Sequence, residues 1–141
     1  MSEQNVELHR RAAEALNSRD VEALIATSDP SIELHSSMTT PGGASYHGHD
    51  GVLKYLQDLE DAWGNELRLE PEAYFDLGEQ TLAFHVTHGR GRQSGAEVEM
   101  PVAQVAKWRD GLCVYFKVHL NREDALTDLG VSKDALEPIA P

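Results

Sequence analysis

Cysteine is nearly absent from this chain, because Cys113 is the only one among its 141 residues. A single cysteine excludes a disulfide within the chain and is typical of proteins in the reducing cytoplasm. Two interpretations of Cys113 stay open: a reactive nucleophile, or a small buried residue. The apolar sequence around it favours the second, because a reactive thiolate needs an accessible, electropositive setting. We therefore expect a cytoplasmic protein.

Basic residues and long apolar runs are also scarce. Twelve lysines and arginines stand against 24 acidic residues, which gives a formal net charge of −12. That charge repels phosphate backbones and anionic lipids, so we expect neither nucleic acid nor a membrane as a partner. No apolar run is long enough to span a bilayer, and we expect no secretory signal. The tip of a hairpin is the simpler explanation of the basic run 90–92.

What is present has the composition of one ordinary domain. Hydrophobic residues make up 40% of the chain and charged residues 26%, as in typical globular proteins. A chain of this length buries about two-thirds of its surface on folding, which is enough for a core without disulfides. We assign the domain to residues 1–131 and a C-terminal tail, with room for a short helix, to residues 132–141.

The first half of the chain is predicted to be mainly helical. Apolar residues recur at helical spacing in segments 8–16, 21–25 and 52–63, and the third is the clearest. Asp20 is the expected N-cap of the second helix, and Asp29-Pro30 ends it. Residues 31–36 alternate apolar and polar side chains, which predicts a short strand. Residues 38–45 are predicted to form a loop.

The second half is predicted to be an antiparallel meander. Strands are expected at 66–77, 80–90, 97–109 and 112–120, with turns at 77–79, 93–95 and 110–111. Asn121 is the expected N-cap of a last helix that Gly130 ends. Helices followed by such a meander predict an α+β fold, with helices on one face of the sheet. We expect a curved antiparallel sheet of about five strands wrapped around helices, a cone with an internal pocket.

Motifs in this order resemble the SnoaL-like branch of the nuclear transport factor two-like (NTF2-like) superfamily, which shares the cone fold of ketosteroid isomerase. They cover about residues 3–131 and are Tyr46-x-Gly48-His49-Asp50-Gly51, Ser94-Gly95-x-Glu97-x-Glu99-x-Pro101, Trp108-x-Asp110-Gly111 and Asn121-Arg122-x-x-Ala125-Leu126. The resemblance implies a small apolar ligand and a homodimer formed through the outer face of the sheet. Because the superfamily contains cyclases, isomerases, dehydratases and non-catalytic binding proteins, the fold does not decide the function.

Alignment with ketosteroid isomerase and the two-residue period of strands predict which side chains line the pocket. On strand 80–90 the side chains expected to face inward are Leu82, Phe84, Val86 and His88. The expected ligand contacts are Tyr46, Trp63, Phe84, Val86, Met100, Val102, Gln104 and Phe116. The predicted wall is therefore apolar, with His88 and Gln104 as its polar interruptions.

The catalytic groups of two family members are missing from this sequence. The isomerase needs a tyrosine, a carboxylate base and a protonated acid, but the aligned positions hold Ala12, Leu34 and Gln104. Limonene epoxide hydrolase, another member of the superfamily, needs two inward acids, and we find no such pair. His88 is then the main candidate for acid–base catalysis, with His35 a second near the mouth, because imidazole exchanges protons near neutral pH. The alternative is that His88 only orients a ligand or bonds to the backbone.

We expect no cofactor and no metal site. His47 and His49 form a pair without a third ligand, and His85 and His88 should point to opposite faces of a strand. The face expected to carry His85, Thr87, Ala103, Val105, Lys107, Cys113, Tyr115 and His119 is mixed in character. A mixed face suits a homodimer interface.

Two hypotheses for the function remain. The first is a homodimeric SnoaL-like protein that binds a small apolar molecule. If it is an enzyme, we expect an acid–base isomerase, cyclase or lyase that acts on a polyketide- or terpenoid-like compound. The second is a non-catalytic binding or scaffold homodimer. The sequence leaves open whether the protein is an enzyme.

Overall fold

A computed structural model describes residues 2–91 and 94–141. Its elements, in chain order, are α1 (Ser2–Ser18), α2 (Val21–Ala26), β1 (Ser28–Ser36), β2 (Ala44–His47), α3 (Gly48–Trp63), the short 3₁₀ helix η1 (Gly64–Glu66), β3 (Arg68–Leu77), β4 (Gln80–Arg90), β5 (Glu97–Arg109), β6 (Leu112–His119), α4 (Arg122–Leu129) and η2 (Lys133–Ala135). None of the helices in this part of the chain combines the length and the apolar character that a membrane span requires.

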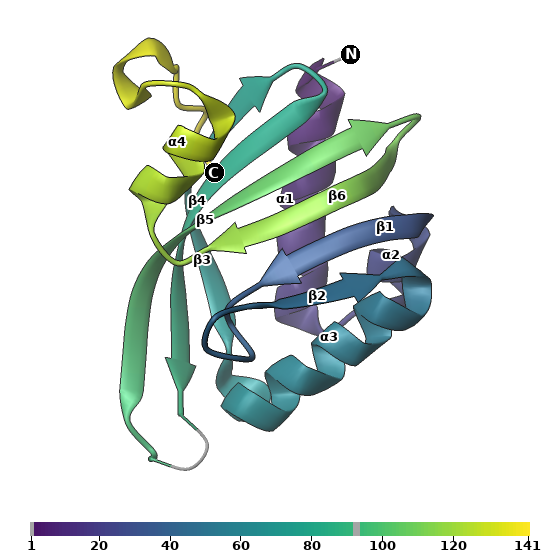
Figure 1. Cartoon of the computed structure of the whole chain (residues 1–141), viewed down its shortest axis with the longest axis vertical. Helices are drawn as coiled ribbons and strands as arrows, with labels where there is room; N and C mark the ends of the chain where they lie inside the picture. The colour runs from purple at the N-terminus through teal and green to yellow at the C-terminus, as the bar shows by residue number, and fades with distance from the viewer. Residues whose placement is uncertain (1, 92–93) are drawn as a thin grey trace.

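The strands form one curved sheet in the order β2-β1-β6-β5-β4-β3 (Figure 1). The α+β class is confirmed, but the sheet has six strands rather than about five, and it is mixed because β1 pairs with β6 in parallel. The additional strand is β2. It falls partly in the segment predicted as a loop and pairs with β1, with Tyr46 opposite Leu34.

Local sequence signals account for the ends of several elements. Asp110 and Gly111 have φ values of 53° and 78°, which the tight turn between β5 and β6 requires. Asn121 caps α4 by accepting hydrogen bonds from the amides of Glu123 (2.8 Å) and Asp124 (3.3 Å), and Gly130 ends this helix in the left-handed conformation. The expected turn at 93–95 and the basic run 90–92 lie partly outside the described residues.

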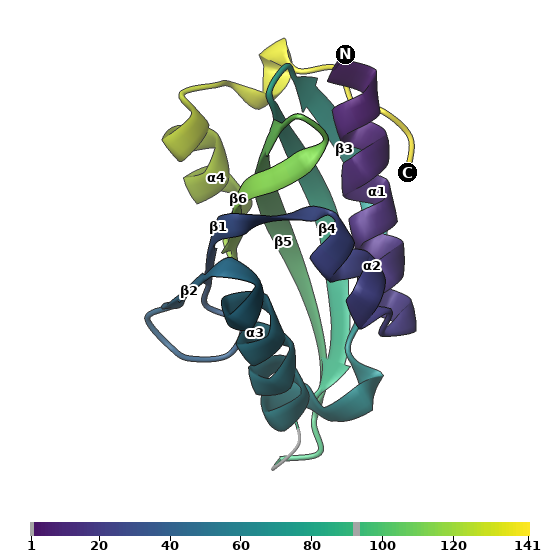
Figure 2. The ribbon, with the colours of Figure 1, turned by 90° about the vertical axis from the view of Figure 1, so that its right-hand side faces the viewer.

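The helices cover both faces of the sheet. Helices α1 and α2 lie together over one part of the inner face and α3 lies over another part, while α4 packs against the opposite, outer face (Figure 2). A cluster of α4 and outer-face side chains accounts for this packing: Phe75, Leu82, Phe84, Ala103, Val105, Ala125 and Leu126. The outer face of β4 and β5 is therefore as apolar as their inner face.

Burial on both faces explains why the predicted orientation of β4 is wrong. Opposite residues of an antiparallel pair share one face, and Gln104 pairs with Ala83, Val102 with His85, and Met100 with Thr87. His85 and Thr87 therefore point inward with Val102 and Gln104, and Leu82, Phe84, Val86 and His88 point outward. An alternating apolar pattern identifies the inner face only when the other face is solvated.

The free edge of the sheet at β3 is covered by two other segments. Asn17 of α1 donates to the carbonyl of Leu69 (2.9 Å) and accepts from its amide (2.8 Å). Further along, Ile139 exchanges two backbone hydrogen bonds with Tyr74, at 2.9 and 2.7 Å. The C-terminal tail, whose short helix is the 3₁₀ turn η2, thus packs back against the domain.

Candidate functional site

The inner face of the sheet and the helices above it line a partly open cavity of about 90 Å³. Its walls are mainly apolar and include Leu16, Tyr55, Leu69 and Phe116, and Gln104 is one of the polar side chains that line it. None of the described residues that line this cavity carries a formal charge. The site therefore suits a neutral group, because a buried charge without a partner is strongly unfavourable.

Two further spaces adjoin this cavity. A smaller one, of about 20 Å³, has Thr87, Val102 and Gln104 in its wall. A groove of about 450 Å³ is lined by residues of α1, α2 and α3. Leu16 lines all three spaces. The interior and the surface groove therefore share lining side chains.

A chain of hydrogen bonds stands behind Gln104. The indole Nε1 of Trp108 donates to Thr81 Oγ1 (2.9 Å), Thr81 Oγ1 lies 2.7 Å from His9 Nδ1, and His9 Nε2 lies 3.1 Å from Gln104 Oε1. An amide oxygen only accepts, so His9 Nε2 carries the hydrogen and Nδ1 accepts from the hydroxyl of Thr81. This order gives every member of the chain a partner, and it orients the Gln104 amide.

His9 is neutral in this series of hydrogen bonds. Burial lowers its pKa to about 4, although the hydrogen bond with Gln104 acts in the opposite direction. Oε1 of Gln104 is held by His9, and Gln104 lines both the main cavity and the smaller one. No hydrogen-bond partner for its Nε2 group occurs among residues 2–91 and 94–141. The structure thus presents a fixed, neutral donor to an apolar space.

A second group of buried polar side chains lies on the same face of β4. His85 Nε2 is 3.3 Å from the Tyr74 hydroxyl. His85 Nδ1 and Thr87 Oγ1 have no partner within the described part of the chain. Burial lowers the pKa of His85 to about 3, and the nearby His9 and Arg122 act in the same direction. Neither buried histidine therefore titrates near pH 7.

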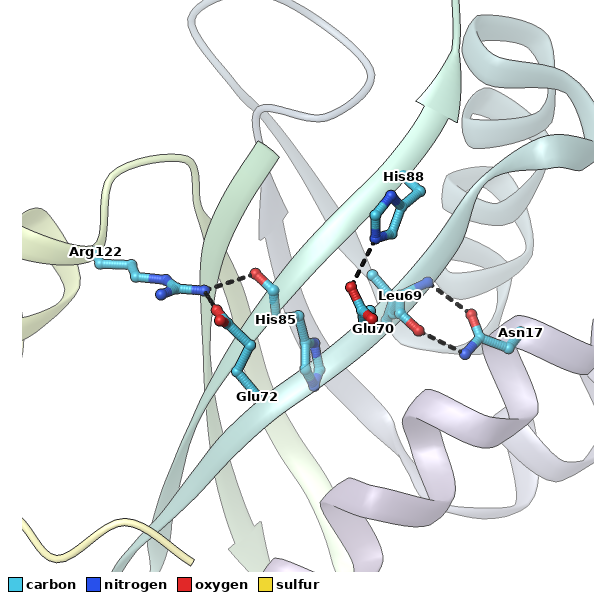
Figure 3. Close-up of polar contacts among 7 residues, drawn as sticks. All are labelled: Asn17, Leu69, Glu70, Glu72, His85, His88 and Arg122. Atoms are coloured by element: carbon cyan, nitrogen blue, oxygen red, sulfur yellow. Dashed lines mark hydrogen bonds and ion pairs between the residues drawn. The ribbon is translucent and has the colours of Figure 1, made fainter. Parts of the chain in front are cut away.

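The two histidines predicted to be catalytic lie on the outer face of the sheet. His88 Nε2 is 2.9 Å from Glu70 Oε1, and the two side chains point toward one another (Figure 3). His35 Nδ1 is 2.9 Å from Ser45 Oγ, and its ring lies 5.4 Å from that of Tyr115. Because odd and even residues of a strand face opposite sides, neither can reach a ligand in the cavity.

Two of the predicted ligand contacts also point outward. The ring of Phe84 packs 4.6 Å beneath the guanidinium of Arg122, and Val86 shares its face. Figure 3 shows Arg122 bridging Glu72 and the carbonyl of His85. These contacts attach the start of α4 to the outer face, so Phe84 has a packing role there.

The remaining predicted contacts lie on the inner side, at different depths. Gln104 and Phe116 line the main cavity, Val102 lines the smaller one, and Met100 packs against the inner core. Trp63 donates from Nε1 to the carbonyl of Met38 (2.8 Å). Tyr46 donates to Asp58 (2.8 Å) and packs against Tyr55. The structure thus places Trp63 and Tyr46 in packed positions, and Gln104 and Phe116 at the cavity.

Sequence reasoning missed His9, Thr81, His85 and Thr87. A usable signal existed for His9, because Val6, His9, Ala13 and Leu16 share one face of α1 and three of them are buried. Cys113, expected on the outer face, lines the cavity instead, after a register shift between Lys107 and Trp108. Burial raises the pKa of its thiol to about 12, which argues against a nucleophile.

No three metal-binding side chains converge within the described ranges. The pair noted in the sequence diverges, because His49 Nε2 lies 2.7 Å from the carbonyl of Ser28 and His47 Nε2 lies 3.9 Å from Glu33. The cavity, with one oriented amide, is therefore the candidate site.

A cone-shaped α+β domain with such an interior belongs to a known structural class. An NTF2-like protein of unknown function from Burkholderia pseudomallei is 22% identical, with a TM-score of 0.76 over 88% of this chain and 95% of that one. A candidate polyketide cyclase from Xanthomonas campestris pv. campestris is 18% identical (TM-score 0.73; 89% and 96% covered). TerC, co-crystallised with polyporic acid, is also 18% identical (TM-score 0.73; 89% and 97% covered). These similarities establish the fold.

The family follows from the sequence itself. Residues 9–116 match the SnoaL-like domain, and this match covers more than half of the chain. The chain therefore belongs to the family of SnoaL-like domains, which confirms the resemblance seen in its motifs. No curated protein matches the chain at a significant level.

Proposed function

We propose that this protein binds a small, neutral, largely apolar molecule inside the cone, and that Gln104 donates a hydrogen bond to an oxygen atom of that molecule. The observation that carries the proposal is the unpartnered Nε2 group of Gln104, a residue that His9 orients and that lines the apolar cavity. A carbonyl oxygen of a ligand would supply the acceptor that this donor lacks, and one such hydrogen bond contributes about 0.5–1.5 kcal/mol.

Binding without catalysis is the function that this geometry favours. The pKa values of His9 and His85, about 4 and about 3, are far from those of an efficient proton shuttle at neutral pH. An isomerase, cyclase or lyase acting on a polyketide- or terpenoid-like compound is the second candidate. It draws support from the polyketide cyclase assignment of the Xanthomonas structure, and the donor of Gln104 could polarise a ketone for such a reaction.

The test compares two ligands of equal shape, acetophenone and α-methylstyrene, which differ in having a carbonyl or a methylene group. Binding is measured by NMR titration. We expect the protein to prefer acetophenone by about fivefold, the effect of one hydrogen bond of about 1 kcal/mol. Gln104→Leu should abolish the preference, and Gln57→Leu, in the surface groove, should retain it. If the Gln104→Leu variant still preferred acetophenone as strongly as the native protein does, the proposal would be wrong.

We further propose a cytoplasmic homodimer. The free, buried thiol of Cys113 is compatible with a reducing compartment. Ala103 and Val105, predicted at the dimer interface, are instead covered by α4 of the same chain. The uncovered part of the outer face lies around Tyr115, with Lys107 above its ring (4.8 Å) and His35 beside it. We assign the dimer contact to that part.

A further inference from the structure

The groove between α1–α2 and α3 has an apolar character that the packing of the domain does not use. In the described part of the chain only three large hydrophobic side chains are exposed, and two of them line this groove: Val21 (39%) and Leu53 (46%). Leu16, Leu24 and Leu56 form its floor and also line the main cavity. The apolar surface is thus continuous from the interior to the groove.

The sizes of the two spaces indicate that neither is a complete ligand site. Sites for drug-sized ligands measure about 300–1,000 Å³. The interior cavity, at about 90 Å³, falls below that range, whereas the groove, at about 450 Å³, lies within it. However, only the cavity has the oriented donor of Gln104. A ligand that uses both features must extend from one space into the other.

We infer that the ligand is elongated, with a neutral oxygen-bearing head at Gln104 and an apolar tail that passes Leu16 and lies in the groove between α2 and α3. This inference rests on the proposed function and names the ligand class of the same site: a neutral ketone or related carbonyl compound with an extended hydrocarbon chain. Leu16 is then the residue that determines which shapes pass, because its side chain borders all three spaces.

The charges around the path agree with a neutral head and an apolar tail. None of the described residues lining the cavity is charged, so an anionic head would lie among apolar side chains. The charged residues that line the groove are Arg19 and Glu60. The guanidinium of Arg19 donates to the carbonyls of Leu16 (2.7 Å) and Leu67 (2.8 Å). Arg19 therefore connects α1 to the segment before β3.

The experiment measures the dissociation constants of a series of alkyl phenyl ketones, from acetophenone to octanophenone. In the native protein each added methylene should tighten binding by about two- to fourfold, the effect of burying one methylene, until the groove is filled. Leu53→Asn should flatten this dependence and weaken octanophenone binding much more than acetophenone binding. Leu120→Asn is the matched control, because Leu120 is the third exposed hydrophobic residue and does not line the groove. It should keep the full dependence.

Leu16→Trp tests the passage itself and should weaken octanophenone binding by at least tenfold relative to acetophenone. If Leu53→Asn and native protein show the same chain-length dependence while acetophenone still requires Gln104, the inference is wrong and the proposed function stands. If acetophenone binds independently of Gln104, both fail. If Leu53→Asn instead lowers the sedimentation mass and leaves the chain-length dependence intact, the groove contacts a second copy of the chain, which also overturns the inference.

Discussion

Two buried histidines, both kept neutral by burial, determine the hydrogen bonding inside the domain. His9 and His85 are both fully buried, and each accepts or donates hydrogen bonds only as neutral imidazole in its surroundings. Protonation of His9 would remove the acceptor at Nδ1 and leave the hydroxyl of Thr81 without its partner. The donor offered by Gln104 thus depends on a histidine that never contacts the ligand.

The same two residues predict how stability depends on pH. Their folded-state pKa values, about 4 and about 3, lie below the unfolded value of about 6.5. Between these values the unfolded chain binds more protons than the folded protein, so stability is complete above about pH 6.5 and falls as the pH decreases. At pH 5 we expect each of these histidines to lower the free energy of unfolding by on the order of 2 kcal/mol relative to pH 7.5.

Urea denaturation at pH 7.5 and pH 5 measures this effect. His9→Gln should lose less stability than the native protein over that interval, because one of the two titrating groups is gone. His35→Gln, on the outer face and partly exposed, serves as the control and should follow the native protein. Identical pH dependences for native protein and His9→Gln would show that His9 is accessible to protons in the folded state.

At the scale of elements, the end of α3 is fixed by a close approach to β4. A Cβ atom on Gly89 would lie 3.1 Å from Cε3 of Trp63 and 3.3 Å from Cδ1 of Leu67. Both distances are shorter than ordinary van der Waals contacts. Gly89 therefore lets the C-terminal turn of α3 and the segment before β3 pack directly on the strand.

Gly89→Ala should accordingly destabilise the protein by about 1–3 kcal/mol, the usual effect of overpacking. In a Trp63→Ala background the same substitution should cost less than half as much, because the nearest obstructing ring is removed. A double-mutant cycle in urea gives the coupling energy. Additive effects would mean that Trp63 does not restrict this part of β4.

Several elements could be predicted from the sequence, and others could not, for identifiable reasons. The ends of β4, β5 and α4 are as predicted, because turn and cap residues such as Asp110-Gly111 and Asn121 determine them locally. The four-residue strand β2 has no periodicity of its own and depends on pairing with β1. The face of β4 could not be predicted, because α4 buries the side that an isolated sheet would expose.

The candidate site was predicted less well than the fold. Gln104, Val102 and Phe116 were placed correctly on the inner side, since the strand period on β5 and β6 is regular there. His9 was missed because helical apolar stripes were counted without their polar members. The hydrogen bonds that link Trp108 to Gln104 join residues up to 95 positions apart in the sequence, and only the folded topology brings them together.

For the whole molecule, the outer face of the sheet divides into a covered and an uncovered part. Helix α4 covers Ala103 and Val105, whereas Tyr115, Lys107 and His35 lie on the strands beyond it. This division restricts where a second copy of the chain can bind. The proposed homodimer therefore has its centre on β1 and β6 rather than on β5.

Tyr115→Asp should convert the homodimer into a monomer, because it places a charge at the centre of the proposed contact. Sedimentation equilibrium at micromolar concentration measures the mass. Leu53→Asp, on the helical side of the molecule, adds the same charge elsewhere and should leave the dimer intact. A native protein that sediments as a monomer would contradict the assembly itself, and a dimeric Tyr115→Asp variant would contradict its location.

The two segments that cover β3 have a consequence for solubility. An uncovered edge strand offers a row of backbone donors and acceptors that any extended chain can join, and it is a common starting point for aggregation. Asn17 occupies the backbone of Leu69, and Ile139 that of Tyr74. The segment around Ile139 thus hinders other protein molecules from adding a strand at this edge. We expect this pairing to affect aggregation in concentrated solution more than the folding stability of the single molecule.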